Sequence, residues 1–406
     1  AALAGAQTLR QTALAAGADA YPDADYDLAG AHFLLGQVLF WAGDAATALP
    51  LLQQAEQGFS SIAQSRGSAS AEGMATSCLT SQADCLCDLG QLAAAATVYQ
   101  TAIALDEQRG AARDVAVGKL QLGMVYLRQK RYPQALAAYE AARISFAALN
   151  EPRSVATSWH QTGRTYQEAD EAHKAEDAYR QALVIKVRLG DIAGQAGTLG
   201  QLANLYDALG QTEEAVVFYR QALDKTCGDT AAEGRRRNNL ADSLCKLGLW
   251  DEAREQIQQA IACKSQFGHA ASPWTSWENL AKIETGAGQT AAAQHARQQA
   301  LAHYLAYRRA GGENHSGEGR LCAVIHTMLD AGEQSQAQAM LQELAADPQY
   351  ANDLPVHALL ASLQALVRGS RDASLAQNQA LYYADAAEIT LLLENLLEPA
   401  AKGECV

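Results

Sequence analysis

Apolar and small residues recur along the chain with a period near 40 residues. A glycine or polar turn residue is followed five positions later by alanine at eight places, with turns at Gly43, Gly90, Lys130, Asp170, Gly210, Gly248, Gly288 and Gly332. Seven residues before the turn stands a small residue in all cases except Ile325, and nine residues after it a large residue is usual, as at Tyr139 and Tyr179. This pattern indicates stacked pairs of antiparallel helices, because one pair cannot bury its apolar face alone.

Each pair has a first helix, here helix A, and a second, helix B. Small residues on both are expected to allow a close approach, while the aromatic residue on helix B is expected to fill the gap between one pair and the next. The composition supports this interpretation, because an alanine-rich chain with 8 prolines and 6% aromatic residues favours helix over sheet. The sequence therefore predicts an all-α fold.

Segments such as "LGMVYLRQKRYPQALAAYEAA" and "LANLYDALGQTEEAVVFYRQAL" place small, aromatic, glycine and alanine residues in an order that resembles the tetratricopeptide repeat. The resemblance covers about residues 28–346. The period exceeds the usual ~34 residues and is similar to that of kinesin light chains and of the C-terminal sensor arrays of bacterial STAND signalling NTPases. It implies a right-handed superhelical solenoid of about eight helix-turn-helix repeats with terminal capping helices.

The ends of the array depart from the pattern. Residues 1–27 are predicted to hold an N-terminal helix, as a partial repeat or a cap, residues 28–346 the eight repeats, and residues 347–406 capping helices and a tail. The last apolar helix, with Ala386, Ile389, Leu393 and Leu396 on one stripe, is expected to be a cap or a docking helix for a partner. Pro50 lies early in a predicted helix B, where we expect a kink or a late helix start.

The resemblance also implies a binding surface. In this family the A helices line a concave groove and contact ligands through positions 2, 5, 9 and 12, counted so that the small residue is position 8. Carried over to this sequence, the candidate groove residues are Met124, Leu127, Thr157, His160, Arg164, Gln167, Asn204, Asp207, Arg235, Asn238 and Asp242.

These residue types suit an extended protein or peptide partner. Arginine grips a carboxylate bidentately and asparagine both donates to and accepts from a peptide backbone, so the partner is expected to carry an acidic group or a C-terminal carboxylate. The likeness to sensor arrays implies the ligand-sensing domain of a bacterial signalling or defence protein, with an effector or NTPase domain in the full-length chain. A small-molecule sensor, with the apolar repeat three as the floor of its pocket, and a passive oligomerisation scaffold are the alternatives.

Charge and hydropathy exclude two partner classes. The chain carries 45 Asp and Glu against 31 Lys and Arg, and the run "RRRNNLADSL" beginning at Arg235 spreads its arginines about 100° apart around a helix, so no nucleic-acid partner is expected. No apolar run approaches the roughly 18 residues that span a bilayer, so no membrane partner is expected. The eight cysteines show no framework spacing, which indicates thiols in a reducing cytoplasm.

No motif for catalysis or cofactor binding was found. The sequence lacks a phosphate-binding loop, a dinucleotide fingerprint, a nucleophile elbow and a His-Glu-x-x-His motif, so we expect no enzymatic activity and no cofactor. Cys322, His326 and Asp330 share helical spacing, but this spacing alone is too weak to predict a zinc site. His160 has no nucleophile nearby in sequence and is interpreted as a polar group of the groove.

Overall fold

The regular elements of the protein are helices throughout the described part of the chain, as predicted. The computed structural model describes residues 2–18, 20–225, 230–350, 353–378 and 380–397. The chain divides into two compact bodies, residues 1–205 and 206–406, here called the N-terminal and C-terminal bodies. No helix within these ranges is both long and apolar enough to cross a membrane.

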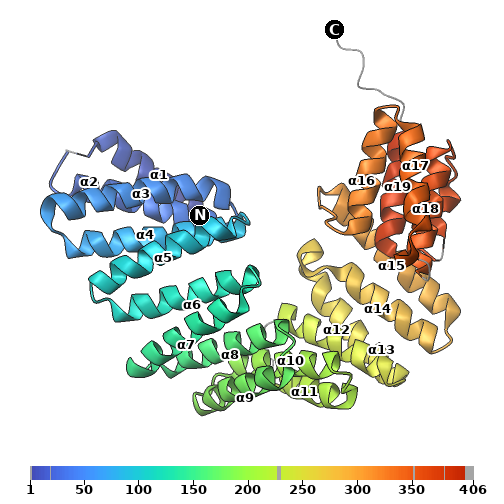
Figure 1. The fold of residues 1–406 in the computed structure, drawn as a ribbon, viewed down its shortest axis with the longest axis horizontal. Helices are drawn as coiled ribbons and strands as arrows, with labels where there is room; N and C mark the ends of the chain where they lie inside the picture. Colours follow the sequence, from blue (N-terminus) through green and yellow to red (C-terminus); the bar gives the residue numbers. More distant parts are fainter. Residues whose placement is uncertain (1, 19, 226–229, 351–352, 379, 398–406) are drawn as a thin grey trace, which may run out of the picture. The chain divides into compact units, whose positions relative to one another are not determined.

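The N-terminal body is built from consecutive antiparallel helices (Figure 1). They are α1 Ala2–Ala16, α2 Ala24–Trp41, α3 Ala45–Arg66, α4 Ala69–Asp88, α5 Leu92–Gln108, α6 Ala112–Arg128, α7 Tyr132–Ala148, α8 Pro152–Glu168, α9 Ala172–Arg188 and α10 Ile192–Ala208, the last of which crosses the boundary between the bodies. From α6 to α10 every helix has 17 residues and every turn has three, which is the origin of the 40-residue period.

The C-terminal body continues the same alternation of A and B helices. Its helices are α11 Thr212–Asp224, α12 Thr230–Lys246, α13 Trp250–Ser265, α14 Pro273–Gly286, α15 Thr290–Arg309, α16 Gly317–Asp330, α17 Gln334–Ala346, α18 Leu354–Val367 and α19 Tyr383–Leu397. Three short 3₁₀ helices, η1 Gly268–Ala271, η2 Pro348–Tyr350 and η3 Ala373–Gln377, occupy connections.

All eight turn positions marked by the sequence period have left-handed backbone conformation. The φ angle is 86° at Gly43, 58° at Lys130 and 59° at Asp170, and between 73° and 76° at the other five glycines. At Lys130 the turn is closed by the amide of Arg131, which donates to the carbonyl of Tyr126 at 2.9 Å. This wide hydrogen bond and the left-handed residue end helix A and start the return into helix B.

The small residue of helix A and the large residue of helix B contact each other within one repeat. A Cβ atom added to Gly123 would lie 2.5 Å from the Tyr139 ring, and one added to Gly163 would lie 2.6 Å from the Tyr179 ring. Both rings are fully buried. The rings therefore lie against the glycines of their own pairs, and groups of the next pair, Arg164 and Thr165, also act on the Tyr139 hydroxyl.

Two further expectations about helix ends can be compared with the structure. A late helix start at Pro50 is contradicted, because α3 begins at Ala45, where Asp44 accepts a hydrogen bond from the amide of Thr47 at 3.0 Å. At the other end of the chain the apolar stripe of α19 is buried: Ile389 and Leu393 belong to a core shared by α16, α17, α18 and α19. The stripe therefore covers the last repeats of the C-terminal body, as a cap does.

Candidate functional site

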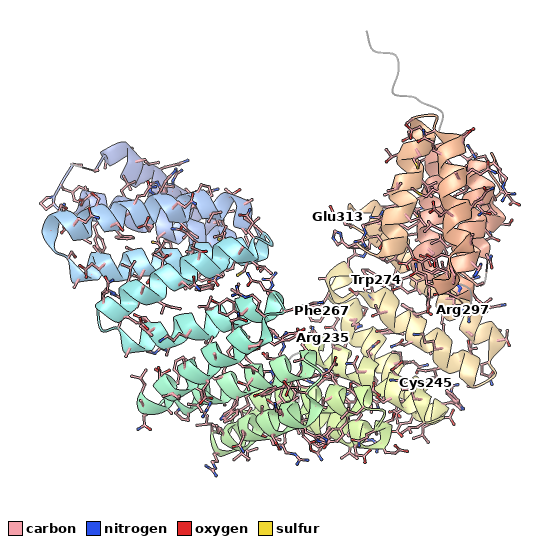
Figure 2. The ribbon with its side chains drawn as sticks, in the orientation of Figure 1. Arg235, Cys245, Phe267, Trp274, Arg297 and Glu313 are labelled. Atoms are coloured by element: carbon pink, nitrogen blue, oxygen red, sulfur yellow. The ribbon has the colours of Figure 1, made fainter. Side chains whose placement is uncertain are left out.

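The candidate groove residues lie on the A helices α6, α8, α10 and α12, and they differ in accessibility. In α6, Met124 is 37% exposed, whereas Leu127 is 3% exposed and belongs to the hydrophobic core with Tyr139. Leu127 is therefore a core residue, and its predicted place on an accessible surface is corrected. In α12, Arg235 is exposed (Figure 2).

A buried polar cluster in the N-terminal body joins repeat four, formed by α8 and α9, to α10, the first helix of repeat five. The Lys186 ammonium, at the end of α9, donates to Thr198 Oγ1 on α10 at 2.8 Å. Thr198 in turn donates to the carbonyl of Gly194 at 3.0 Å, and its Oγ1 lies 3.3 Å from Nδ1 of His160 on α8. Because the hydroxyl proton is directed to Gly194, the neutral His160 tautomer with a proton on Nδ1 satisfies all three contacts.

The cluster has displaced pKa values with clear physical causes. Burial, followed by the charges of Lys186 and Arg164, lowers the pKa of His160 to about 3, so this ring is neutral at physiological pH. Burial also lowers the pKa of Lys186, while the carboxylate of Asp191 acts in the opposite direction. His160 is thus a structural link between two A helices rather than a free groove side chain.

The remaining candidates on α8 and α10 are divided between structural contacts and open positions. Gln167 accepts a hydrogen bond from the Tyr179 hydroxyl at 2.8 Å, and the Thr157 hydroxyl bonds to the backbone of its own helix. Arg164 has a side chain that is 41% exposed and lies 3.5 Å from Glu168 of the same helix. Asn204 is half-buried and takes part in contacts within the protein. Arg164 is therefore the accessible cation on this face.

A similar cluster in the C-terminal body joins repeat six, formed by α12 and α13, to repeat seven, formed by α14 and α15. Asn238 on α12 accepts a hydrogen bond from Ser276 on α14 at 2.8 Å, and these two residues occupy the same repeat positions as His160 and Thr198. Lys264, at the end of α13 and equivalent to Lys186, donates to Thr275 Oγ1 at 3.0 Å. Burial and then the charge of Arg235 lower the pKa of Lys264 to about 8.

Arg235 has no salt bridge among the residues that the structure describes. Its nearby charged neighbour is instead a second cation, because the charge of Arg235 disfavours protonation of Lys264. Two positive groups without a carboxylate form a site that an anionic group would neutralise.

Asp207 and Asp242 are engaged in an ion-pair network of the C-terminal body. The Lys246 ammonium lies 2.7 Å from a carboxylate oxygen of Asp207 and 3.0 Å from one of Asp242. Ser243 donates a further hydrogen bond to Asp207 at 3.1 Å. These acids are therefore partnered within the protein, and they bind the end of α10 to α12.

The three arginines of the "RRR" run have separate environments, as their helical spacing predicts. Arg237 donates to Glu233 and to Gln256, at 2.8 Å in both cases, and so stabilises repeat six internally. Arg236 also has partners within the protein. Only Arg235 is exposed.

Sequence reasoning missed the two buried lysines, although a signal for them exists. Lys186 and Lys264 stand eleven residues after the fixed alanine of helix B, where three repeats place Phe59, Phe146 and Tyr304 and repeat two places Asp106. The aromatic residues are at most 7% exposed, and the lysines are 9% and 5% exposed. A charged residue at a position that several repeats fill with a buried aromatic residue marks a polar cluster inside the array.

The candidate zinc residues do not form a metal site. Cys322 is buried and His326 Nδ1 lies 3.6 Å from Asp330, but no group of three metal-binding side chains occurs in the described ranges. The six cysteines within those ranges are free thiols, and Cys227 and Cys405 lie outside them.

The fold and the recurring contacts define a helical-repeat protein, and comparison with known families identifies the repeat. Profiles of the tetratricopeptide repeat match residues 114–186, 198–231 and 235–265. The chain is thus a tetratricopeptide repeat protein, with further helix pairs on both sides of the matched segments in the same register.

Solved structures with similar repeats include BtubC (BKLC) from P. vanneervenii, with 21% identity, a TM-score of 0.48, and coverage of 55% of this chain and 89% of that one. A putative kinesin light chain from Podosopora anserina has 21% identity, a TM-score of 0.41, and coverage of 47% and 95%. The quorum sensor NprR from B. thuringiensis has 13% identity, a TM-score of 0.45, and coverage of 73% and 87%. No curated protein matches the sequence.

Proposed function

We propose that the chain is a non-enzymatic scaffold that binds a protein segment or peptide on the A-helix face, with an anionic group of the partner at Arg235. The observation that carries this proposal is the pair of neighbouring cations in the C-terminal body. Arg235 is exposed and has no acidic partner among the described residues, while Lys264 behind it is buried and has a depressed pKa. A carboxylate bound there would gain a charge-assisted contact with Arg235 and would favour the charged form of Lys264.

Accessible groups around this pair suit a peptide. Asp242 and Lys246 form a partly exposed ion pair about two to three turns further along α12, and Lys282 lies on the next A helix, α14. In the N-terminal body Arg164 offers a second cation and Met124 an exposed apolar contact. We propose that partner segments use these groups, each within its own body, and that the chain is the ligand-sensing part of a bacterial signalling protein. The contacts between successive A helices, such as Asn238 with Ser276, provide a route by which a bound ligand would bias the stacking of repeats.

The experiment is selection of peptides from a random library, followed by affinity measurement with the purified variants. Arg235→Ala is expected to weaken binding of the selected peptides about tenfold or more, because a charge-assisted contact is lost. Arg164→Ala with Arg235→Ala is expected to abolish binding. Arg297→Ala is the matched control, since Arg297 is an exposed arginine of α15 in the same body (Figure 2).

The stability of each variant is measured beside its affinity. Circular dichroism is expected to remain unchanged and melting to be no lower than in the wild type, because Arg235 is exposed, makes no salt bridge in the described part of the chain and opposes the charge of Lys264. Full affinity in the double variant would refute the proposed site. Equal losses in Arg235→Ala and Arg297→Ala would show that only general charge attraction was measured.

A further inference from the structure

The C-terminal body contains a cavity that the repeat pattern does not predict. It has a volume of about 470 Å³ and lies among α14, α16, α18 and α19, at the place where the last repeats meet the capping helices. Its charged lining residues are Glu278, Lys282, Glu318, Asp353 and Asp385. Its apolar part comes from Pro355, Val356, Tyr382, Tyr383 and Ala384. This volume is within the range of small-ligand sites in proteins.

The carboxyl group of Asp385 is buried in the wall of this cavity and lacks a partner. The residue is only 4% exposed. Within the described ranges its side chain has no hydrogen bond and no salt bridge, and it is absent from the residues that have further contacts. A buried carboxylate without donors is costly, since burial removes the water that would otherwise solvate it. Asp385 therefore offers an unused acceptor to whatever enters the cavity.

The neighbouring acids Asp353 and Glu388 have hydrogen-bond or ion-pair partners within the protein. Asp353 caps α18 by accepting a hydrogen bond from the amide of Val356 at 3.1 Å. Glu388, one turn after Asp385 in α19, lies 2.8 Å from Arg308 and accepts from Asn314 at 3.0 Å. Asp385 differs from both, because it lies in the first turn of its helix and still receives no side-chain or capping contact.

The charge of the cavity selects a cation. Four carboxyl groups face one ammonium group, Lys282, which forms no ion pair with Asp385. The helix N-termini of α16, α18 and α19 contribute about half an elementary charge each, so together with Lys282 they offset only two to three of the four carboxylates. An anion would meet net negative charge here, whereas a cation would gain Asp385.

The cation is organic rather than metallic. No cluster of three metal-binding side chains occurs among the described residues. The rings of Tyr382 and Tyr383 lie beside the carboxylates, with Tyr382 52% exposed and Tyr383 packed edge-on against Tyr304 at 5.4 Å. Aromatic faces and carboxylates together are the usual surroundings of an ammonium or guanidinium group attached to an apolar body.

We propose that this cavity binds an organic ammonium group, with Asp385 as its counter-ion and the tyrosine rings around its apolar stem. The group is supplied either by a free amine or by a lysine side chain of a bound peptide. The counter-ion of this site, Asp385, is a different residue from Arg235, although Lys264 donates to Thr275 in the cavity lining, so Asp385→Asn tests this site and Arg235→Ala tests the anion site.

Binding at this site is expected to depend on pH. Burial and the charges of Glu318, Glu388 and Asp353 raise the pKa of Asp385 to about 7. Further charged groups around the cavity are Glu278 and Lys282 of α14, Arg308 of α15, which is paired with Glu388, and Lys264 of α13, which donates to the lining residue Thr275. Because the ionised carboxylate is the binding form and an alkylammonium group stays charged to about pH 10, affinity is expected to increase from pH 6 to pH 8.

The test uses calorimetric titration of the full chain with phenethylamine and with Nα-acetyl-lysine methylamide. Their neutral counterparts, 2-phenylethanol and the Nε-acetylated lysine derivative, are titrated in parallel. The ammonium probes are expected to bind, and the neutral counterparts are expected to bind at least tenfold more weakly. Preference for one ammonium probe over the other separates a free amine from a lysine side chain as the natural source.

Asp385→Asn is the decisive variant, and Glu394→Gln on the same helix is its matched control. Glu394 pairs with Arg309 on the surface, away from the cavity lining. Asp385→Asn is expected to weaken ammonium binding about tenfold or more and to melt no lower than the wild type at pH 8, since the buried charge is removed. Absence of ammonium binding in the wild type, unchanged affinity in Asp385→Asn, or equal binding of the neutral probes would each overturn the proposal.

Discussion

The junctions between repeats four and five and between repeats six and seven have the same design but opposite electrostatic surroundings. In both, a polar residue of one A helix contacts a hydroxyl of the next A helix, as His160 does with Thr198 and Asn238 with Ser276. In both, a buried lysine at the end of helix B donates to a hydroxyl of the following repeat. The neighbours of the lysines differ, because Asp191 favours the charge of Lys186 while Arg235 opposes that of Lys264.

This difference separates a structural polar cluster from the proposed binding site. Lys186 has an acid nearby, an acceptor in Thr198 and a neutral imidazole beside it, so the first junction needs nothing from outside. The second junction is left with excess positive charge, and an anion from a partner would complete it. The position of a residue in the repeat therefore does not by itself predict a ligand contact. The sign of the charge beside each buried lysine distinguishes the two junctions.

The largest expected effect concerns acid sensitivity of the first junction. His160 has a pKa of about 3 in the folded protein and about 6.5 when unfolded. The unfolded chain therefore binds a proton first, and stability is full above pH 6.5 and falls as the pH decreases toward 3. Between pH 7 and pH 4.5 this group is expected to cost the wild type on the order of 2 kcal/mol of stability. His160→Asn carries the residue found at the equivalent position 238, and its stability is expected to fall by about that much less over the same pH range.

Urea denaturation at the two pH values measures this change. His326→Asn is the control, because His326 lies on a partly exposed face of α16 beside Asp330. If the wild type and His160→Asn lost the same stability, protonation of the His160 imidazole would cost the folded protein no free energy. The first junction would then be no more sensitive to acid than the second junction, which has Asn238 at this position.

An equal or smaller effect is expected from removing the hydroxyls that accept from the two lysines. Thr198→Val leaves the buried Lys186 ammonium without its acceptor and also removes the contact with His160, so a cost of about 2 kcal/mol is expected. Thr275→Val is expected to cost about 1 kcal/mol, because Thr275 is half-buried beside a cavity that admits water. Chemical denaturation at pH 7 gives both values. Equal costs, or a larger cost at Thr275, would contradict the view that the first junction is the more closed of the two.

The fold could be predicted from the sequence because the pattern of turn, small and large residues recurs in each repeat. Each turn at a left-handed residue such as Lys130 or Asp170, and each glycine placed opposite a tyrosine, is determined by contacts within about 40 residues of chain. Repetition turned weak local preferences into a register that fixed the type of helix and the positions of the turns.

The site was less accessible because it depends on which repeats deviate. The family positions gave Leu127 a groove role that its core packing rules out, and they did not distinguish His160, which is used internally, from the accessible Arg164. Lys264 was missed although three other repeats place an aromatic residue at its position. The cavity around Asp385 lies outside the period altogether, because it depends on how α18 and α19 pack against the last repeats.

The smallest expected effect is a change in the pKa of a single lysine, and it tests the comparison most directly. Arg235→Ala is expected to raise the pKa of Lys264 from about 8 toward its ordinary value by about one unit, because a neighbouring like charge is removed. The pKa of Lys186 is expected to stay unchanged. NMR titration of ¹³C-labelled lysine side chains measures both. In the wild type the unfolded chain retains its proton up to about pH 10.5, so stability is also expected to rise between pH 8 and pH 10.5, and less so in the variant. If the pKa of Lys264 were unchanged in Arg235→Ala, the two cations would not act on one another. The second junction would then have no excess positive charge to attract a partner, and it would not differ from the first.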